Sequence, residues 1–208
     1  MAEGKWVMED GTRFTTEELE EKLISGSQEA AEALRGTLFS LARFYEADGR
    51  HDQSDHAWNR AMELVEDPEE KAGLLLGRGC DCEKRRDFET AAGCYAKGLP
   101  LEPTNSKVNY YLHNNLGFCL LQDGDYERAE VYCRSAIRIA PGRHNAHKNL
   151  GLSLQGQGEY EGAARSLLEA AELRREDGRA LRHLRMLADE YPEVVACVPG
   201  VSEALKDL

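Results

Sequence analysis

The second half of the chain contains a sequence repeat, and this repeat limits the possible fold more strongly than any other feature. A segment that begins at Tyr110 is followed 34 positions later by a similar segment that begins at His144. The positions that match are Asn115, Leu116, Gly117, Gly124, Tyr126, Ala129 and Ala136, which recur as Asn149, Leu150, Gly151, Gly158, Tyr160, Ala163 and Ala170. A fixed period of this length indicates a solenoid, in which each repeat packs only on its neighbours.

Two earlier segments fit the same frame with fewer matches. One begins near Ala72 and the other near Arg35. The matching positions are Gly79, Phe88, Ala91, Tyr95 and Pro103 in the former, and Leu38, Leu41, Ala42, Tyr45, Gly49, Trp58 and Ala61 in the latter. Their starts lie 37 rather than 34 positions apart, so we expect extra loop residues at 66–70.

Small and apolar residues recur at helical spacing within the clearest repeat. Leu116, Gly117 and Leu120 fall on one face of a first helix, because positions separated by three or four residues share a face. Ala129 and Ala136 share a face of the second helix. The small residues allow the two helices to approach closely, and we expect Gly117 and Ala129 to meet at the crossing.

Turn residues predict where these two helices end. Gly124 can adopt the left-handed conformation that a tight turn between helices needs. Pro141 stops the second helix, because the residue before a proline disfavours the helical conformation. Each helix pair buries only part of its apolar surface, so neighbouring pairs must stack to complete a core.

These features resemble the tetratricopeptide repeat family. The resemblance covers residues 35–177 and is strongest over 110–175. It departs from the family pattern at Arg78, where leucine is usual, and at Arg175, where proline is usual. The resemblance implies an all-α fold, namely a right-handed superhelical solenoid of about four helical hairpins with a C-terminal capping helix and a short N-terminal extension.

The same frame divides the chain into three parts. Residues 1–34 are expected to form the N-terminal extension and cap, residues 35–177 the repeats, and residues 178–208 the capping helix and tail. The four repeats are expected at about 35–68, 72–105, 110–143 and 144–177. Helices are expected near 36–47, 53–65, 72–84, 88–99, 106–122, 126–139, 144–156, 160–174 and 179–190.

The N-terminal extension carries local signals of its own. An Asp-Gly pair between β-forming residues predicts a short hairpin over residues 6–14. A capping-box pattern at Thr15 predicts a helix through about Ile24, and another helix should begin near Gln28. The extension is either a recognition element or a cap packed on the first repeat.

The apolar pattern between Arg179 and Tyr191 predicts an amphipathic capping helix. The positions expected on its apolar stripe are Leu181, Leu184, Ala188 and Tyr191. A solenoid needs such a helix, because its last repeat otherwise exposes apolar surface. Beyond Pro192 we expect an extended stretch and then a short helix through Lys206.

Charge excludes some classes of partner. The chain carries 26 basic and 38 acidic side chains, a net charge of -12. Residues 1–109 have 14 basic and 23 acidic side chains (-9), and residues 110–208 have 12 and 15 (-3). An acidic chain repels phosphate groups, so we expect neither nucleic acid nor a membrane as a main partner.

We expect a cytoplasmic location with reduced cysteines. The N-terminus has no apolar stretch of signal-peptide length, and no run approaches the roughly 20 apolar residues of a membrane span. In the cytosol the six cysteines would be thiols rather than disulfides.

Residues that could support chemistry do not form a recognisable set. Cys80 and Cys82 would point about 200° apart on a helix, and no second close pair completes a tetrahedral zinc site. His144 and His147 lie three positions apart but lack a third ligand at helical spacing. There is no glycine-rich phosphate loop and no nucleophile elbow. We therefore expect no catalytic residue, no metal and no cofactor, and we interpret the chain as a non-enzyme.

The family resemblance places particular residues on the concave surface that the first helix of each pair lines. In the third and fourth repeats these are Tyr111, Asn114, Asn115, Phe118, Gln122, Asn145, Lys148, Asn149, Leu152 and Gln155. The first two repeats contribute Phe39, Arg43, Glu46, Leu76, Cys80 and Glu83. Continuing the frame into the capping helix adds Arg179, Arg182 and His183 beside Lys148.

Two interpretations of the asparagines remain open. Asn115 and Asn149 form a two-step ladder, and an amide can pair with a peptide backbone through its donor and its acceptor. Alternatively, each amide bonds a neighbouring helix.

The basic end also has two interpretations. It partly resembles the clamp with which some tetratricopeptide cochaperones hold the carboxylates at the C-terminus of heat-shock chaperones. Asn149 matches the central asparagine of that clamp. Arg179 occupies a position where the clamp has a lysine, and His183 occupies one where it usually has an arginine. Asn114 and Phe118 do not match the usual lysine and asparagine of the first two clamp positions. The alternative is a solvated basic face.

The sequence therefore predicts an adaptor or scaffold that binds a peptide segment or a partner helix in the concave groove. The partner segment is expected to carry an acidic or C-terminal carboxylate end. A second hypothesis is an accessory subunit, or a cochaperone-like component, that packs on an enzyme or secretion complex through its convex face or its ends. The sequence leaves the oligomeric state and the identity of the partner open.

Overall fold

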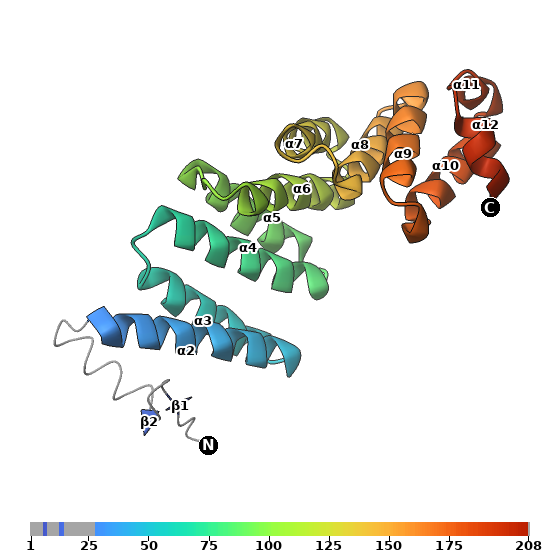
Figure 1. The fold of residues 1–208 in the computed structure, drawn as a ribbon. Helices are drawn as coiled ribbons and strands as arrows, with labels where there is room; N and C mark the ends of the chain where they lie inside the picture. The colour runs from blue at the N-terminus through green and yellow to red at the C-terminus, as the bar shows by residue number, and fades with distance from the viewer. Residues whose placement is uncertain (1–5, 8–12, 15–27, 208) are drawn as a thin grey trace.

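The computed structural model describes residues 6–7, 13–14 and 28–207. Over these residues the chain forms antiparallel helix pairs that stack side by side into an elongated, curved array, with the first pair at one end and the last helices at the other (Figure 1). This arrangement is the expected all-α superhelical solenoid.

The nine helices expected between residues 36 and 190 are present. The four pairs are α2 (Gln28–Ala47) with α3 (His51–Glu63), α4 (Pro68–Lys84) with α5 (Phe88–Gly98), α6 (Ser106–Asp123) with α7 (Tyr126–Ile139), and α8 (His144–Gly156) with α9 (Tyr160–Leu173). The turns η1 (Leu99–Leu101) and η2 (Arg175–Asp177) follow α5 and α9, and η2 occupies the place where the family usually has a proline. The cap consists of α10 (Arg179–Glu190), α11 (Pro192–Ala196), α12 (Val201–Ala204) and η3 (Leu205–Asp207).

One helix is longer than expected and another begins earlier. α2 begins at Gln28, where a helix was expected, and continues without a break to Ala47, so the expected limit of the extension at residue 34 falls inside this helix. α4 begins at Pro68, and the Asp67 side chain accepts a hydrogen bond of 3.0 Å from the backbone N–H of Glu70. A proline at the first helical position and an aspartate before it both favour a helix start. The extra loop residues therefore form the first turn of α4.

The N-terminal extension contains a short strand pair. Strands β1 (Trp6–Val7) and β2 (Arg13–Phe14) are antiparallel, with Trp6 opposite Phe14. These strands lie where the hairpin was expected. Its turn at residues 8–12 and the helix expected from Thr15 to Ile24 lie outside the described residues.

The C-terminal cap differs from the expectation beyond Pro192. The extended stretch predicted there is wrong, because Pro192 begins α11. Val195, Val198 and Val201 are buried and pack into the same core as Leu184 of α10. Their spacing of three residues places them on one side of the tail, so the tail folds back and closes the end of the solenoid.

Close helix crossings occur where small residues were predicted. A Cβ atom added to Gly117 would lie 3.3 Å from the backbone oxygen of Ala129 and 2.8 Å from Sγ of Cys133. In the next repeat, a Cβ atom at Gly151 would lie 3.1 Å from the backbone oxygen of Ala163. The predicted meeting of Gly117 and Ala129 is thus confirmed.

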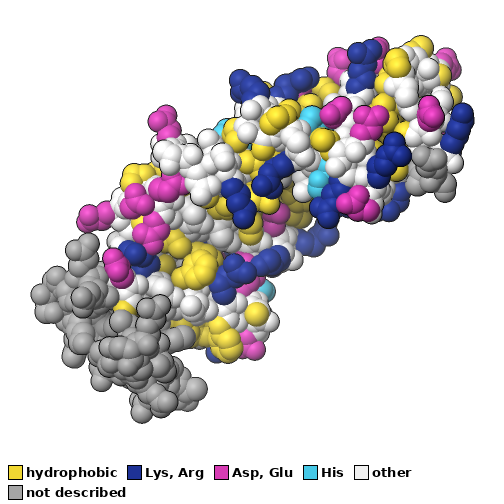
Figure 2. Space-filling view, viewed as in Figure 1, with side chains coloured by type: hydrophobic (Ala, Val, Ile, Leu, Met, Phe, Trp, Pro, Cys, Tyr) yellow, Lys and Arg dark blue, Asp and Glu magenta, His cyan; other side chains and the backbone are white. Residues whose placement is uncertain are grey.

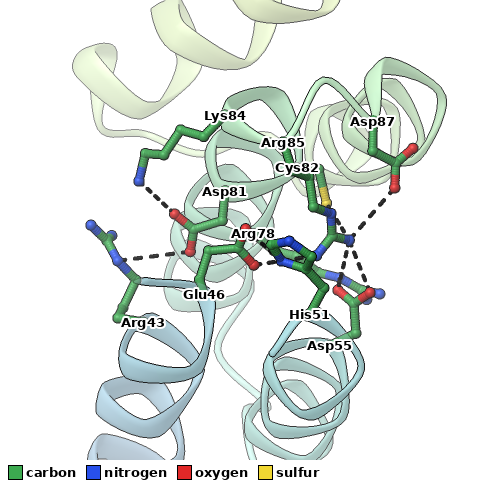
Figure 3. Close-up of polar contacts among 10 residues, drawn as sticks. All are labelled: Arg43, Glu46, His51, Asp55, Arg78, Asp81, Cys82, Lys84, Arg85 and Asp87. Carbon is green, nitrogen blue, oxygen red and sulfur yellow. Dashed lines mark hydrogen bonds and ion pairs between the residues drawn. The ribbon is translucent and has the colours of Figure 1, made fainter. Parts of the chain in front are cut away.

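A cluster of charged side chains joins the first two helix pairs (Figure 3). This junction cluster consists of Arg43, Glu46, His51, Asp55, Arg78, Asp81, Lys84, Arg85 and Asp87. The Arg85 side chain is only 13% exposed, and its guanidinium lies 3.2 Å from Glu46 and 2.9 Å from Asp55. The cluster thereby connects α2, α3 and α4.

The junction cluster accounts for Arg78, which stands where the family usually has leucine. Its Nη1 donates a 2.6 Å hydrogen bond to Oδ1 of Asn59, and its Nε lies 3.6 Å from Asp55. Leucine cannot make either contact. The departure from the family pattern therefore belongs to a polar junction between α3 and α4.

Candidate peptide-binding groove

The predicted groove residues of the third and fourth repeats and of the cap lie on α6, α8 and α10, and they differ in accessibility. The half-buried ones are Tyr111, Asn115, Phe118, Asn145, Lys148, Leu152, Gln155 and His183, the exposed ones are Gln122, Arg179 and Arg182, and the buried ones are Asn114 and Asn149. In the first two repeats, Arg43 and Glu46 belong to the junction cluster.

The asparagines bond neighbouring helices. Nδ2 of Asn149 donates to Oδ1 of Asn114 at 3.3 Å, and Nδ2 of Asn114 donates to Oδ1 of Asn115 at 2.9 Å. Asn149 is 2% exposed and Asn114 is 5% exposed. Their assignment to the groove surface therefore needs correction, because the packing of α6 against α8 covers both amides.

The amide chain continues into the second repeat. Nδ2 of Asn115 donates to the hydroxyl of Tyr95 at 3.4 Å, and this hydroxyl donates to Oε1 of Glu83 at 2.7 Å. Burial raises the pKa of Glu83, and burial together with the Glu83 charge raises the pKa of Tyr95. The phenol therefore stays protonated and acts as the donor. We call this chain from Glu83 to Asn149 the amide relay; it connects α4, α5, α6 and α8.

The basic residues expected at the C-terminal end of the groove act on one another through their charges. Lys148 is half-buried, and burial, followed by the nearby Arg179 charge, lowers its pKa. Burial lowers the pKa of His183, and the charges of Lys148 and Arg182 add to this effect. Figure 2 shows Lys and Arg side chains beside histidines on the half of the molecule that the later helices form.

Arg179 is held in place by a carboxylate that sequence analysis did not single out. Its Nη2 donates to Asp177 at 2.7 Å, and Nε2 of His144 lies 2.9 Å from the same carboxylate. Hydrogen bonds from Arg179 hold the pKa of Asp177 well below its usual range. Asp177 therefore links the cap to α8 and offsets part of the Arg179 charge.

A hollow that residues of α6, α8 and α10 help to line contains three tyrosines. This tyrosine pocket has a volume of about 450 Å³. Its lining consists of Leu121, Gln122, Tyr126, Leu152, Gln155, Gly156, Tyr160, His183, Glu190 and Tyr191. It thus continues the surface on which Gln122, Leu152 and His183 were predicted.

The tyrosines of this pocket were missed by sequence reasoning. The rings of Tyr160 and Tyr191 stack with centroids 3.7 Å apart, and a Cβ atom at Gly156 would overlap the ring of Tyr126. The available signal was that Tyr126 and Tyr160 recur at the repeat spacing directly after each turn. That recurrence indicates a shared structural position, but the pocket depends on how successive repeats meet.

Two models of the tetratricopeptide repeat match the chain, over residues 110–143 and residues 149–176. These segments contain the three asparagines of the amide relay and the close crossings at Gly117 and Gly151. The chain is a tetratricopeptide repeat protein.

Solved structures with the same fold include other tetratricopeptide repeat proteins. MamA (residues 41 to its end) from Desulfovibrio magneticus RS-1 has a TM-score of 0.60 at 19% identity, covering 82% of this chain and 92% of that chain. The Hsp90 co-chaperone Cns1 from Saccharomyces cerevisiae has a TM-score of 0.59 at 23% identity, covering 64% of this chain and 43% of that chain. No curated protein sequence matches this chain.

A third similar structure contains a bound peptide. The first repeat domain of Spaghetti (RPAP3), bound to the HSP90 peptide SRMEEVD, has a TM-score of 0.54 at 22% identity, covering 60% of this chain and 96% of that chain. At these identities the likeness establishes the fold that this tetratricopeptide repeat protein shares with them.

The thiols of this tetratricopeptide repeat protein belong mainly to its core. Burial raises the pKa of both Cys119 and Cys133 to about 12, so these thiols stay protonated. Over residues 28–207, His, Cys, Asp and Glu side chains nowhere converge in a set of three that could hold a metal. Within the described part of the chain, no helix combines the length and the apolar character that a membrane span needs.

Proposed function

We propose that this tetratricopeptide repeat protein is a non-catalytic adaptor that holds a segment of a partner protein on its concave face. An acidic side chain or C-terminal carboxylate of that segment would lie at the basic end, defined as Lys148, Arg179, Arg182 and His183. The observation that carries this proposal is a half-buried Lys148 that lies within reach of the Arg179 charge, while the charges of Lys148 and Arg182 act on His183.

The electrostatics of Lys148 favour an anion at this position. Its ammonium is half-buried, and its pKa is lowered, which means that the folded protein disfavours its charge. A carboxylate beside it would reverse that effect, because opposite charges stabilise each other in a partly desolvated site. Arg182 is exposed and can form two parallel hydrogen bonds with a carboxylate.

The similar structure with a bound peptide supports this chemistry. The HSP90 peptide held by the RPAP3 domain ends in Glu-Glu-Val-Asp, so a related fold accommodates an acidic C-terminal segment. In this chain, however, the counterparts of the cochaperone clamp include the buried Asn114 and Asn149. The proposal therefore concerns a carboxylate-bearing segment and does not name a chaperone. The six unpaired cysteines favour a reducing compartment, which supports an adaptor that acts in the cytoplasm.

The experiment compares partner capture by variants of the basic end. Partner proteins captured from the source cell by the wild type are identified, and the bound segment is mapped by truncation. Its affinity is then measured for the wild type and for Lys148→Met combined with Arg182→Gln. Each exposed pair contributes about 0–1 kcal/mol, so the double variant should bind up to about 30-fold more weakly. Added salt should weaken wild-type binding, because it screens the same charges.

The matched control is Arg165→Gln, which removes an exposed arginine from α9. It should bind the segment as the wild type does. If the double variant also binds like the wild type at low salt, the basic end is only a solvated face, and the proposal fails.

One observation favours the accessory-subunit hypothesis as a second candidate. Val131 of α7, a second helix of its pair, is 61% exposed. The second helices would form the binding face if Val131→Asp no longer captures the partner while the double variant of the basic end still captures it.

A further inference from the structure

We propose that the tyrosine pocket binds a basic side chain, an arginine guanidinium or a lysine ammonium, of the same partner segment. This inference rests on the proposed function, because His183 of the basic end also lines the pocket. The partner segment would then carry charges of opposite sign at two separate positions.

The walls of the pocket suit a cation. Tyr126 is 37% exposed, and aromatic faces attract a cation that lies within about 6 Å of the ring centre. Glu190 stands at the rim, where its Oε1 accepts a 2.9 Å hydrogen bond from the hydroxyl of Tyr191. A carboxylate has further lone pairs for a guanidinium or an ammonium. The amide oxygens of Gln122 and Gln155 add neutral acceptors.

The preceding repeat shows this contact within the chain itself. The guanidinium of Arg86 lies 5.7 Å from the ring centre of Phe88. Phe88 occupies the repeat position that Tyr126 and Tyr160 occupy later, since 88 is the 17th residue from Ala72, as 126 and 160 are from Tyr110 and His144. The neighbouring hollow of the second repeat is lined by Arg86, Phe88 and Gln122 together.

Glycine replaces that arginine in the next two repeats. Gly124 and Gly158 stand two residues before their tyrosines, as Arg86 stands two residues before Phe88. All three have left-handed backbones, with φ values of 65° at Arg86, 80° at Gly124 and 81° at Gly158. The protein therefore supplies its own cation to Phe88, whereas Gly124 and Gly158 have no side chain that could cover the tyrosines. A cation from the partner can take that place.

The histidine of the pocket does not oppose this assignment at neutral pH. Burial and the charges of Lys148 and Arg182 lower the pKa of His183, so its imidazole is neutral there. Lys148 and Arg182 are not part of the pocket lining. The positive charges thus belong to the basic end, and the aromatic and carboxylate groups belong to the tyrosine pocket.

A small probe tests the pocket separately from the groove. Nα-acetyl-arginine N-methylamide and its uncharged norleucine analogue are titrated into the full chain, and the ring signals of labelled tyrosines are followed by NMR. We expect the arginine probe to shift the signals of Tyr126 and Tyr160, and the norleucine probe to leave them unchanged. Glu190→Gln should weaken arginine binding by about two- to fivefold. Equal binding of the two probes, or no shift with either, would overturn the inference.

Gly124 offers a variant with a matched control. Gly124→Arg should place a guanidinium over Tyr126, as Arg86 does over Phe88, and there is open space at this position. Gly124→Ala imposes the same left-handed strain without the cation. The arginine probe should bind Gly124→Ala like the wild type and should bind Gly124→Arg at least about threefold more weakly. If both variants bind it equally, the pocket does not select a cation.

The result of the probe experiment can be distinguished from the result of the test of the proposed function. The probe lacks a carboxylate, so it should bind the double variant of the basic end as well as it binds the wild type. A protein that binds its partner segment through the basic end but ignores the arginine probe would refute the pocket alone.

Discussion

Replacing Gly79 with alanine should destabilise the array at the centre of the amide relay. A Cβ atom at this position would overlap Cε1 of Tyr95 and would lie 2.7 Å from its Cζ. The ring of Tyr95 is fully buried, so it cannot move into solvent to make room. Any shift of the ring also disturbs the 2.7 Å hydrogen bond to Glu83.

The expected size follows from three terms. Overpacking a core costs about 1–3 kcal/mol, and the disturbed hydrogen bond costs about 0.5–1.5 kcal/mol. Alanine in place of glycine within a helix returns about 0.5–1 kcal/mol. The net effect of Gly79→Ala is therefore a loss of about 0.5–4 kcal/mol in the free energy of unfolding.

The same helix provides the control. Gly73 also lies in α4, and nothing lies within 4 Å of a Cβ atom built there. Gly73→Ala should therefore stabilise the protein by about 0.5–1 kcal/mol. Urea unfolding followed by far-ultraviolet circular dichroism should place the midpoint of Gly79→Ala below the wild type and that of Gly73→Ala above it. Equal midpoints for the two variants would refute this account of the contact between Gly79 and Tyr95.

Three further outcomes are expected. Ala129→Leu should destabilise by about 1–3 kcal/mol in urea unfolding, because it overpacks the crossing at Gly117; a neutral result would contradict that crossing. Asp177 has a lowered pKa, so its ion pairs stabilise the folded state above the unfolded pKa of about 3.9 and are lost as the pH falls through the folded pKa. The difference in the free energy of unfolding between wild type and Asp177→Asn should thus be largest at neutral pH and shrink in acid. A difference that does not change with pH would contradict the stabilising role of these ion pairs. Elemental analysis should find no stoichiometric zinc, and a chelator should leave the melting temperature unchanged.

The helices follow from local patterns, because their signals lie within a few residues of one another. α6 ends at Asp123, directly before a glycine whose φ of 80° is left-handed. The tail shows where such signals fail. Pro192 can end one helix or begin the next, and only the burial of Val195 and Val198 against the last repeat decides for a helix.

The candidate site is only partly encoded in local patterns. The repeat frame places Lys148 beside Arg179 and His183, and their shifted pKa values agree with that placement. The partner of the Asn149 amide, however, lies 35 positions away on another helix. A buried amide and a groove amide give the same sequence signal, since each needs asparagine on the same face of the helix.

Salt should act unevenly along this array. The first helix pair meets the second through the ion pairs of the junction cluster and through the apolar contacts of Leu74 and Trp58, whereas α7, α8, α9 and the cap share one apolar core. In a solenoid the interfaces between neighbours determine how cooperatively the repeats unfold. Because salt screens charges more strongly than it affects apolar contacts, α2 and α3 would separate first and exchange their amide hydrogens earliest. The helices that carry the basic end would stay folded, so the N-terminal pair can open as an independent unit.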